Sequence, residues 1–144
     1  MTGQARPSVV LEACVSLVFH AVLLTALYFL FAGHNAPGGG FIGGLVGGLA
    51  FAMIALAYGI DRARRTLRFH PLSLVGAGIG LTLLSGVPSL LGGGAYLEHP
   101  WLETEVLGLP LALSTTIIFD LGVYAVVIGA VVSFLFGLQR RAEQ

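Results

Sequence analysis

The chain has 144 residues, of which 56% are hydrophobic and only 10% are charged, and its formal net charge is zero. A soluble domain of this length carries about 25% charged residues, so the composition predicts an integral membrane protein with no separate soluble domain. Without net positive charge there is no basic field to attract nucleic acid.

The first predicted span covers residues 9–32, an apolar run long enough to cross about 30 Å of hydrocarbon. Pro7 suits the first turn of the helix. A cleaved signal peptide with Arg6 in its basic region is the alternative, but the apolar run is too long for that reading. Cys14 lies inside the span and is the only cysteine, which excludes an internal disulfide.

A glycine-rich segment follows at residues 33–44, Gly-His-Asn-Ala-Pro-Gly-Gly-Gly-Phe-Ile-Gly-Gly. Its proline lacks a backbone N–H and disfavours helix at Ala36, so the first span ends before it. Glycines four residues apart then place bare backbone along one face of the second span, residues 40–60. We expect a turn followed by a helix whose glycine face forms a groove for helices of partner subunits. The turn and the groove together comprise His34, Pro37, Gly38, Gly39, Gly40, Phe41, Gly43, Gly44, Gly47 and Gly48.

Residues 38–43 also satisfy the GxGxxG pattern of dinucleotide-binding proteins. That motif requires a preceding strand within a βαβ unit, whereas here the preceding element is a membrane span. Nucleotide binding is therefore not expected.

The second half of the chain contains two further spans. Residues 61–70 form a short basic loop, and Pro71 opens a third span at residues 71–91. A longer connection then leads to the fourth span at residues 112–137. In this connection, residues 104–107 and 111–113 are candidates for a small hairpin around a Gly-Leu-Pro turn. Its three glutamates, at positions 98, 103 and 105, favour a solvated loop over a cation-attracting entrance.

Four spans place both chain ends on one side of the membrane. All seven basic residues then share that side, and they are Arg6, Arg62, Arg64, Arg65, Arg68, Arg140 and Arg141. The positive-inside rule assigns this side to the cytoplasm. The predicted fold is an all-α integral membrane domain over residues 1–144, with cytoplasmic termini and a longer external loop between the third and fourth helices.

Three ionisable residues lie within the spans, where they are costly and usually mark functional sites. Glu12 and His20 share one face of the first span with Ser16, and Asp120 in the fourth span is flanked at four-residue steps by Thr116 and Tyr124. Carboxylate and hydroxyl oxygens suit small cations, and carboxylate and imidazole groups carry protons. These residues are the candidates for an ion or proton path, provided that the first and fourth spans are neighbours.

A structural role is the alternative for each of these side chains. Glu12 is shallow enough to reach the interface, and a histidine such as His20 is more often a satisfied interhelical hydrogen bonder than a relay. Asp120 favours a functional or subunit-contact role, with Thr116 and Tyr124 holding it in place. The remaining histidines show no metal-site spacing, and no nucleophile–base pair is present, so we expect no catalytic residue, metal or cofactor, and no enzyme activity.

Residues 33–44 closely resemble the MnhB/MrpB family, whose members are small subunits of Mrp/Mnh-type multisubunit Na⁺/H⁺ antiporters. Residues 119–124, Phe-Asp-Leu-Gly-Val-Tyr, resemble the second hallmark of that family. The resemblance implies a subunit of a large hetero-oligomer in the bacterial cell membrane, which exchanges cytoplasmic Na⁺ for external H⁺. It also implies that larger subunits carry the main proton machinery.

The leading functional hypothesis is an accessory antiporter subunit that packs against partner membrane subunits within the bilayer. One alternative is an autonomous four-helix cation-coupled exporter, for which Glu12 would be the carboxylate in the first span. Another is a purely structural subunit of a related membrane-bound hydrogenase or respiratory complex.

Overall fold

The computed structural model describes residues 9–33, 37–93, 101–106 and 109–142. Four helical stretches are long and apolar enough to cross a membrane, and they are Val9–Ala32, Gly40–Tyr58, Ile60–Leu91 and Thr116–Leu138. The prediction of four spanning helices is therefore confirmed.

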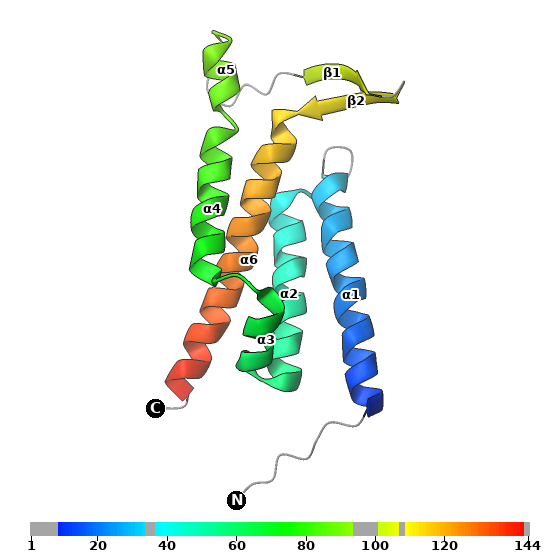
Figure 1. Cartoon of the computed structure of the whole chain (residues 1–144), viewed down its shortest axis with the longest axis vertical. Coiled ribbons are helices and arrows are strands. Elements are labelled where there is room, and N and C mark those ends of the chain that lie inside the picture. The colour runs from blue at the N-terminus through cyan, green and yellow to red at the C-terminus, as the bar shows by residue number, and fades with distance from the viewer. Residues whose placement is uncertain (1–8, 34–36, 94–100, 107–108, 143–144) are drawn as a thin grey trace, which may run out of the picture.

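The described elements are, in chain order, α1 (Val9–Ala32), α2 (Gly40–Tyr58), α3 (Ile60–Leu67), α4 (Pro71–Leu84), α5 (Val87–Leu91), β1 (Trp101–Val106), β2 (Leu109–Ser114) and α6 (Thr115–Ala142). The start of α1, helix α3 and the end of α6 lie at one end of the molecule, and α5 and the two strands lie at the other (Figure 1).

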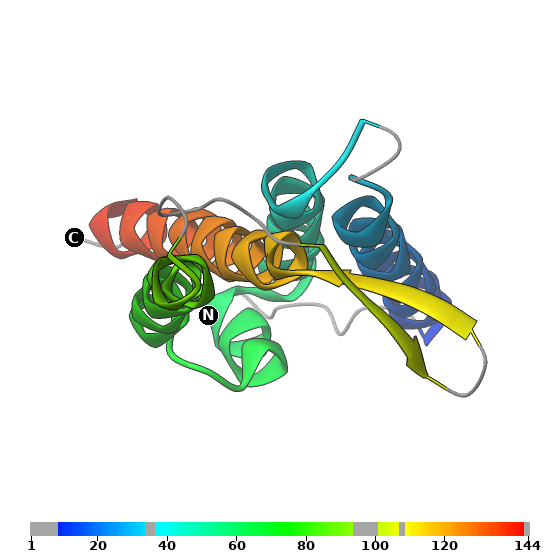
Figure 2. The ribbon, with the colours of Figure 1, turned by 90° about the horizontal axis from the view of Figure 1, so that it is seen from above.

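The spanning helices form a row in the order α4, α6, α2, α1 (Figures 1 and 2). Helix α6 packs against α4 on one side and α2 on the other, and α1 packs against the far side of α2. Helices α1 and α6 barely touch. The two inner helices, α2 and α6, therefore hold the row together.

Glycines let α2 and α6 approach within backbone distance of each other. An added Cβ at Gly44 would lie 2.7 Å from Cβ of Val127, and one at Gly48 would lie 2.8 Å from Cγ1 of Val131. Real Cβ atoms do not approach so closely, so any larger residue would push the two helices apart. In a bilayer, where apolar burial gives little driving force between helices, this close packing itself supplies the attraction.

The same glycine-rich helix contacts α1 on another face. An added Cβ at Gly43 would lie 2.7 Å from the carbonyl oxygen of Ala26 and 3.1 Å from the amide nitrogen of Leu30. The groove predicted from the glycine spacing thus exists, but helices of the same chain fill it. The expectation that partner subunits occupy this face is corrected, because α6 and α1 already cover it.

Helix α4 reaches α6 by a second glycine contact. An added Cβ at Gly78 would lie 2.7 Å from the carbonyl oxygen of Gly122, and one at Gly129 would lie 2.8 Å from that of Pro71. Helix α6 therefore presents Gly122, Gly129 and the side chain of Val126 to α4.

A cluster of buried side chains from α1, α2, α3 and α6 forms the core of the row. This cluster comprises Phe19, Ala50, Phe51, Ile54, Ala55, Ala63, Leu67, Ile128, Val132 and Phe136. Phe19 and Phe51 meet edge to face with ring centroids 5.5 Å apart.

Residues 60–67 form helix α3, whereas the sequence predicts a loop there. Gly59, at a φ of 86°, ends α2, and Arg68, at a φ of 62°, ends α3. Ala63 and Leu67 are buried against the core, while the arginines of α3 are exposed. The helix is amphipathic. Burial of its narrow apolar face stabilises a helix in a charged segment where the sequence predicts a loop.

The third span is broken, although the sequence predicts one helix over residues 71–91. Helix α4 ends at Leu84 and α5 begins at Val87. Pro88 explains the break, because it cannot donate a backbone hydrogen bond and its ring would clash with the carbonyl of Leu84. The buried Ser85 caps the end of α4 by donating from Oγ to the carbonyl oxygen of Thr82, at 2.7 Å.

The connection before α6 contains the predicted hairpin, with longer strands than expected. Strands β1 and β2 are antiparallel, and their register runs from Trp101↔Ser114 to Val106↔Leu109. Because residues 112–114 pair with β1, the fourth helix starts at Thr115 rather than at residue 112. The all-α prediction therefore holds for the spans, to which the structure adds this two-stranded sheet.

We expect Gly44→Ala to lower the melting temperature of the purified chain, because the new Cβ forces α2 and α6 apart. Overpacking of this kind costs about 1–3 kcal/mol. Gly76→Ala is the matched control, since a Cβ at this helical glycine meets nothing within 4 Å. Circular dichroism in detergent measures both variants. Equal melting temperatures would contradict the proposed importance of the glycine contact.

Candidate functional site

The carboxylate of Asp120 lies against the backbone that begins α2. An added Cβ at Gly39 would lie 3.7 Å from each carboxylate oxygen of Asp120. Gly39 has a φ of 92°, and its N–H donates to the carbonyl oxygen of Phe29 at 2.8 Å. Glycine is favoured here because a residue with a side chain would be strained at this φ, whereas a Cβ would make only ordinary contact with the acid.

The backbones of the glycine-motif segment and the Asp120 segment are also in contact. An added Cβ at Gly40 would collide with the carbonyl oxygen of Asp120 and would lie 3.0 Å from the amide nitrogen of Tyr124. One at Gly43 would lie 3.3 Å from the Tyr124 ring, and one at Gly47 would lie 3.3 Å from the Tyr124 hydroxyl. The segments 33–44 and 119–124, distant in sequence, therefore form one site.

The position of Asp120 has an electrostatic consequence. Gly39 is the N-cap of α2, and the first backbone bond of this helix runs from the N–H of Gly43 to the carbonyl oxygen of Gly39, at 3.0 Å. The N–H groups before it have no partner within the helix, and the helix dipole places partial positive charge there. The start of α2 therefore attracts the negative charge of the half-buried Asp120.

The rest of the glycine motif shapes the turn between α1 and α2. Gly38 lies against the carbonyl oxygen of Phe29 and against Gly33, so the chain folds back tightly onto the end of α1. Pro37 and Phe41 are exposed. His34, another predicted residue of this motif, lies outside the described residues.

The second predicted set, on α1, lies away from Asp120. Glu12 and His20 are exposed, and α2 stands between their helix and α6. Nδ1 of His20 lies 2.6 Å from the carbonyl oxygen of Ser16, and the hydroxyl of Tyr58 donates to the backbone carbonyl of Glu12 at 3.4 Å. The structure thus brings Asp120, Thr116 and Tyr124 together on α6 but does not join them to Glu12 and His20 within this chain.

Metal chemistry receives no support from the residues described. No group of three or more His, Cys, Asp or Glu side chains among them is placed to hold a metal ion. What the site offers is one carboxylate at a helix start, with Thr116 half-buried one turn before it and the Tyr124 ring one turn after. Such a group can bind a cation or a proton.

The chain matches a family model and several bacterial sequences over nearly its whole length. The model, described as a domain related to the MnhB subunit of Na⁺/H⁺ antiporters, matches residues 10–133. The B-type subunit of the Na⁺/H⁺ antiporter of Bacillus subtilis is 36% identical over 137 residues, covering 94% of this chain and 95% of the relative.

Two further relatives give the same result. The B-type subunit of the Na⁺/H⁺ antiporter of Alkalihalophilus pseudofirmus is 33% identical and covers 88% of this chain, with 89% of the relative matched. A putative antiporter subunit, mnhB2 of Staphylococcus haemolyticus, is 35% identical over 90% of this chain and 93% of the relative. With the contact between its two hallmark segments, this similarity identifies the chain as a member of the MnhB family.

Proposed function

We propose that this chain is an accessory subunit of a multisubunit Na⁺/H⁺ antiporter and that Asp120 is its functional group. The chain is a multi-pass bacterial membrane protein, and relatives at 33–36% identity are B-type subunits of such antiporters. The observation that carries the proposal for Asp120 is its contact with Gly39 and Gly40, which places a carboxylate at the start of α2.

The role of Asp120 follows from its surroundings. The start of α2 and the backbone contact at Gly40 fix its position, so small movements of α2 against α6 are transmitted to the carboxylate. Its oxygens are suitable for a small cation or a proton. Asp120 therefore has one of two roles. It lines part of the ion path, or it transmits changes in the packing of α2 against α6 to that path.

The exposed face of α1 is the surface proposed for partner subunits. Glu12, Ser16 and His20 are exposed on one helix face of an apolar span, where contact with lipid would be costly for the ionisable side chains. A neighbouring subunit that covers this face would give His20 a polar environment. We therefore assign partner contact to the outer side of α1. The glycine groove is not the partner surface, because helices of this chain fill it.

The alternatives are less well supported. The names of the relatives, which are antiporter subunits, favour an accessory subunit over an autonomous exporter. The names of the relatives place them in antiporters rather than in hydrogenases or respiratory complexes. A transporter subunit is also favoured over an enzyme on the same grounds.

We further propose that the arginine-bearing end of the row faces the cytoplasm. The arginines of α3 and the C-terminal part of α6 share this end, and the hairpin lies at the opposite end (Figure 1). Arginine excess marks the cytoplasmic side of membrane proteins.

Asp120→Asn is expected to leave the antiporter complex assembled but to lower Na⁺-dependent proton exchange several-fold in everted vesicles, since the neutral amide cannot hold a proton or balance a cation. Asp61→Asn is the matched control, because this acid is exposed on α3, away from the glycine contact. Normal exchange by an assembled Asp120→Asn complex would remove Asp120 from the mechanism.

His20→Leu is expected to reduce recovery of partner subunits in an affinity pull-down from membranes, whereas His20→Gln keeps a polar side chain and should retain them. A residue that merely faced lipid would tolerate leucine better than glutamine. Full recovery of partners with His20→Leu would therefore contradict the assignment of this face.

The orientation is tested by cysteine labelling in a Cys14→Ser background. A membrane-impermeant maleimide added outside intact cells should label Glu103→Cys in the hairpin and should leave Gln139→Cys unlabelled until the membrane is permeabilised. Labelling of Gln139→Cys in intact cells would reverse the proposed topology.

A further inference from the structure

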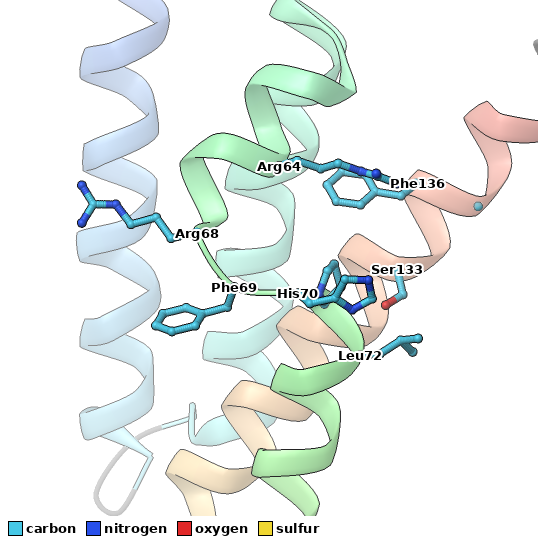
Figure 3. A pocket seen from close by; sticks show the side chains of 9 residues that line it. Arg64, Arg68, Phe69, His70, Leu72, Ser133 and Phe136 are labelled. Carbon is cyan, nitrogen blue, oxygen red and sulfur yellow. The ribbon is translucent and has the colours of Figure 1, made fainter.

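A cavity of about 620 Å³ opens between α3, the start of α4 and the end of α6 (Figure 3). Its walls include Arg64 and His70 on one side and Ser133 and Phe136 on the other. It lies at the arginine-bearing end of the row, far from the hairpin and from the start of α2, which Asp120 contacts (Figure 1). Nothing in the proposed antiport function uses it.

Two arginines, Arg64 and Arg68, bring positive charge to the cavity wall. Residues 60–70 contain four arginines and a single aspartate. The guanidinium of Arg64 stacks on the ring of Phe136, with Cζ 4.9 Å from the ring centroid, and this contact holds the charge at the cavity wall. Arg68 also lines the cavity, although its guanidinium extends away from Arg64 in Figure 3.

The start of α4 adds hydrogen-bond donors at the same wall. His70 is the N-cap and makes no side-chain capping bond, and Pro71 has no N–H. The first backbone bond runs from the N–H of Leu74 to the carbonyl oxygen of His70, at 3.1 Å, so the preceding amides have no partner within the helix. A helix start with free amides and a positive dipole is suited to an anion.

A buried hydroxyl on the opposite wall lacks a partner. Among the described residues, Oγ of Ser133 is the buried side-chain polar atom without a hydrogen bond. Buried polar atoms are normally paired, so an unpaired one at a cavity wall calls for a group that the protein alone does not supply. An anionic oxygen would accept the hydroxyl hydrogen.

The remaining walls are apolar and open outward. Phe69 and Leu72 line the cavity and are 68% and 65% exposed. Exposed apolar side chains at the end of a membrane span are suited to contact with lipid acyl chains. A site with cationic and amide donors beside an exposed apolar wall matches the two halves of a phospholipid better than it matches a free ion.

We propose that this cavity binds the phosphate group of an anionic phospholipid of the inner leaflet. Arg64 supplies the charge, the start of α4 supplies amide donors, and Phe69 and Leu72 contact the acyl chains. The bound lipid would fix the connection between α3 and α4 against the end of α6.

The test compares Arg64→Gln with Arg62→Gln in the full chain. Both arginines are exposed on α3 and both stack on an aromatic ring, since Cζ of Arg62 lies 5.3 Å from the Tyr58 ring centroid, but Arg62 does not line the cavity. Each variant therefore loses the same charge and the same kind of contact. Native mass spectrometry from micelles containing equal amounts of phosphatidylglycerol and phosphatidylcholine reports which lipid stays bound.

We expect the wild type and Arg62→Gln to retain phosphatidylglycerol in preference to phosphatidylcholine, and Arg64→Gln to lose this preference at least several-fold. Circular dichroism verifies that both variants are folded. His70→Ala, which leaves the Phe136 contact intact, gives a second test that does not depend on Arg64 packing and should also weaken retention.

Three results would overturn the proposal. Equal losses in Arg62→Gln and Arg64→Gln would show a diffuse electrostatic attraction without a site. The absence of any preference for phosphatidylglycerol in the wild type would show that the cavity does not select an anionic headgroup. Displacement of the lipid by millimolar inorganic phosphate would assign the cavity to the free ion.

Discussion

The structure depends on the close approach of two backbones, that of α2 from Gly40 onward and that of α6 from Asp120 onward. Apolar side chains gain little by leaving lipid for protein, so helices in a bilayer need contact distances that only small residues allow. Gly40, Gly44 and Gly48 allow these short distances on α2. Gly78 and Gly122 allow the same close approach between α4 and α6. Helix α6 is thereby held from both sides, and a third contact, between Gly43 of α2 and helix α1, completes the row of helices in Figure 2.

The same contact connects the packing motif to the function that we propose for Asp120. A carboxylate in a membrane span requires compensation, and here the start of α2 supplies partial positive charge next to Asp120. Gly39 serves the turn through its positive φ, and Gly40 allows the backbone of α2 to meet the backbone of Asp120. In the proposed function, the residues that pack α2 against α6 are therefore the same residues that position the acid.

Charge organises the opposite end of the molecule. Helix α3 buries Ala63 and Leu67 and exposes its arginines, so it closes the end of the core while presenting a basic surface. The cavity beside it joins that surface to the unpaired hydroxyl of Ser133 and the free amides of α4. The row thus has an acidic site near one end and a basic site near the other, separated by the aromatic and aliphatic core.

The sequence by itself determined the membrane class, the bounds of α1, the number of spans and the glycine face of α2, because hydropathy and four-residue spacing are local properties. It also identified both hallmark segments and the hairpin. Local patterns missed α3, since a charged run conceals an apolar stripe of only a few residues, and they missed the break that Pro88 introduces. Only the tertiary structure decided which helix fills the groove and that Gly39 meets Asp120. Both depend on which spans are neighbours, and that choice is made by surface complementarity between segments about 80 residues apart in the chain.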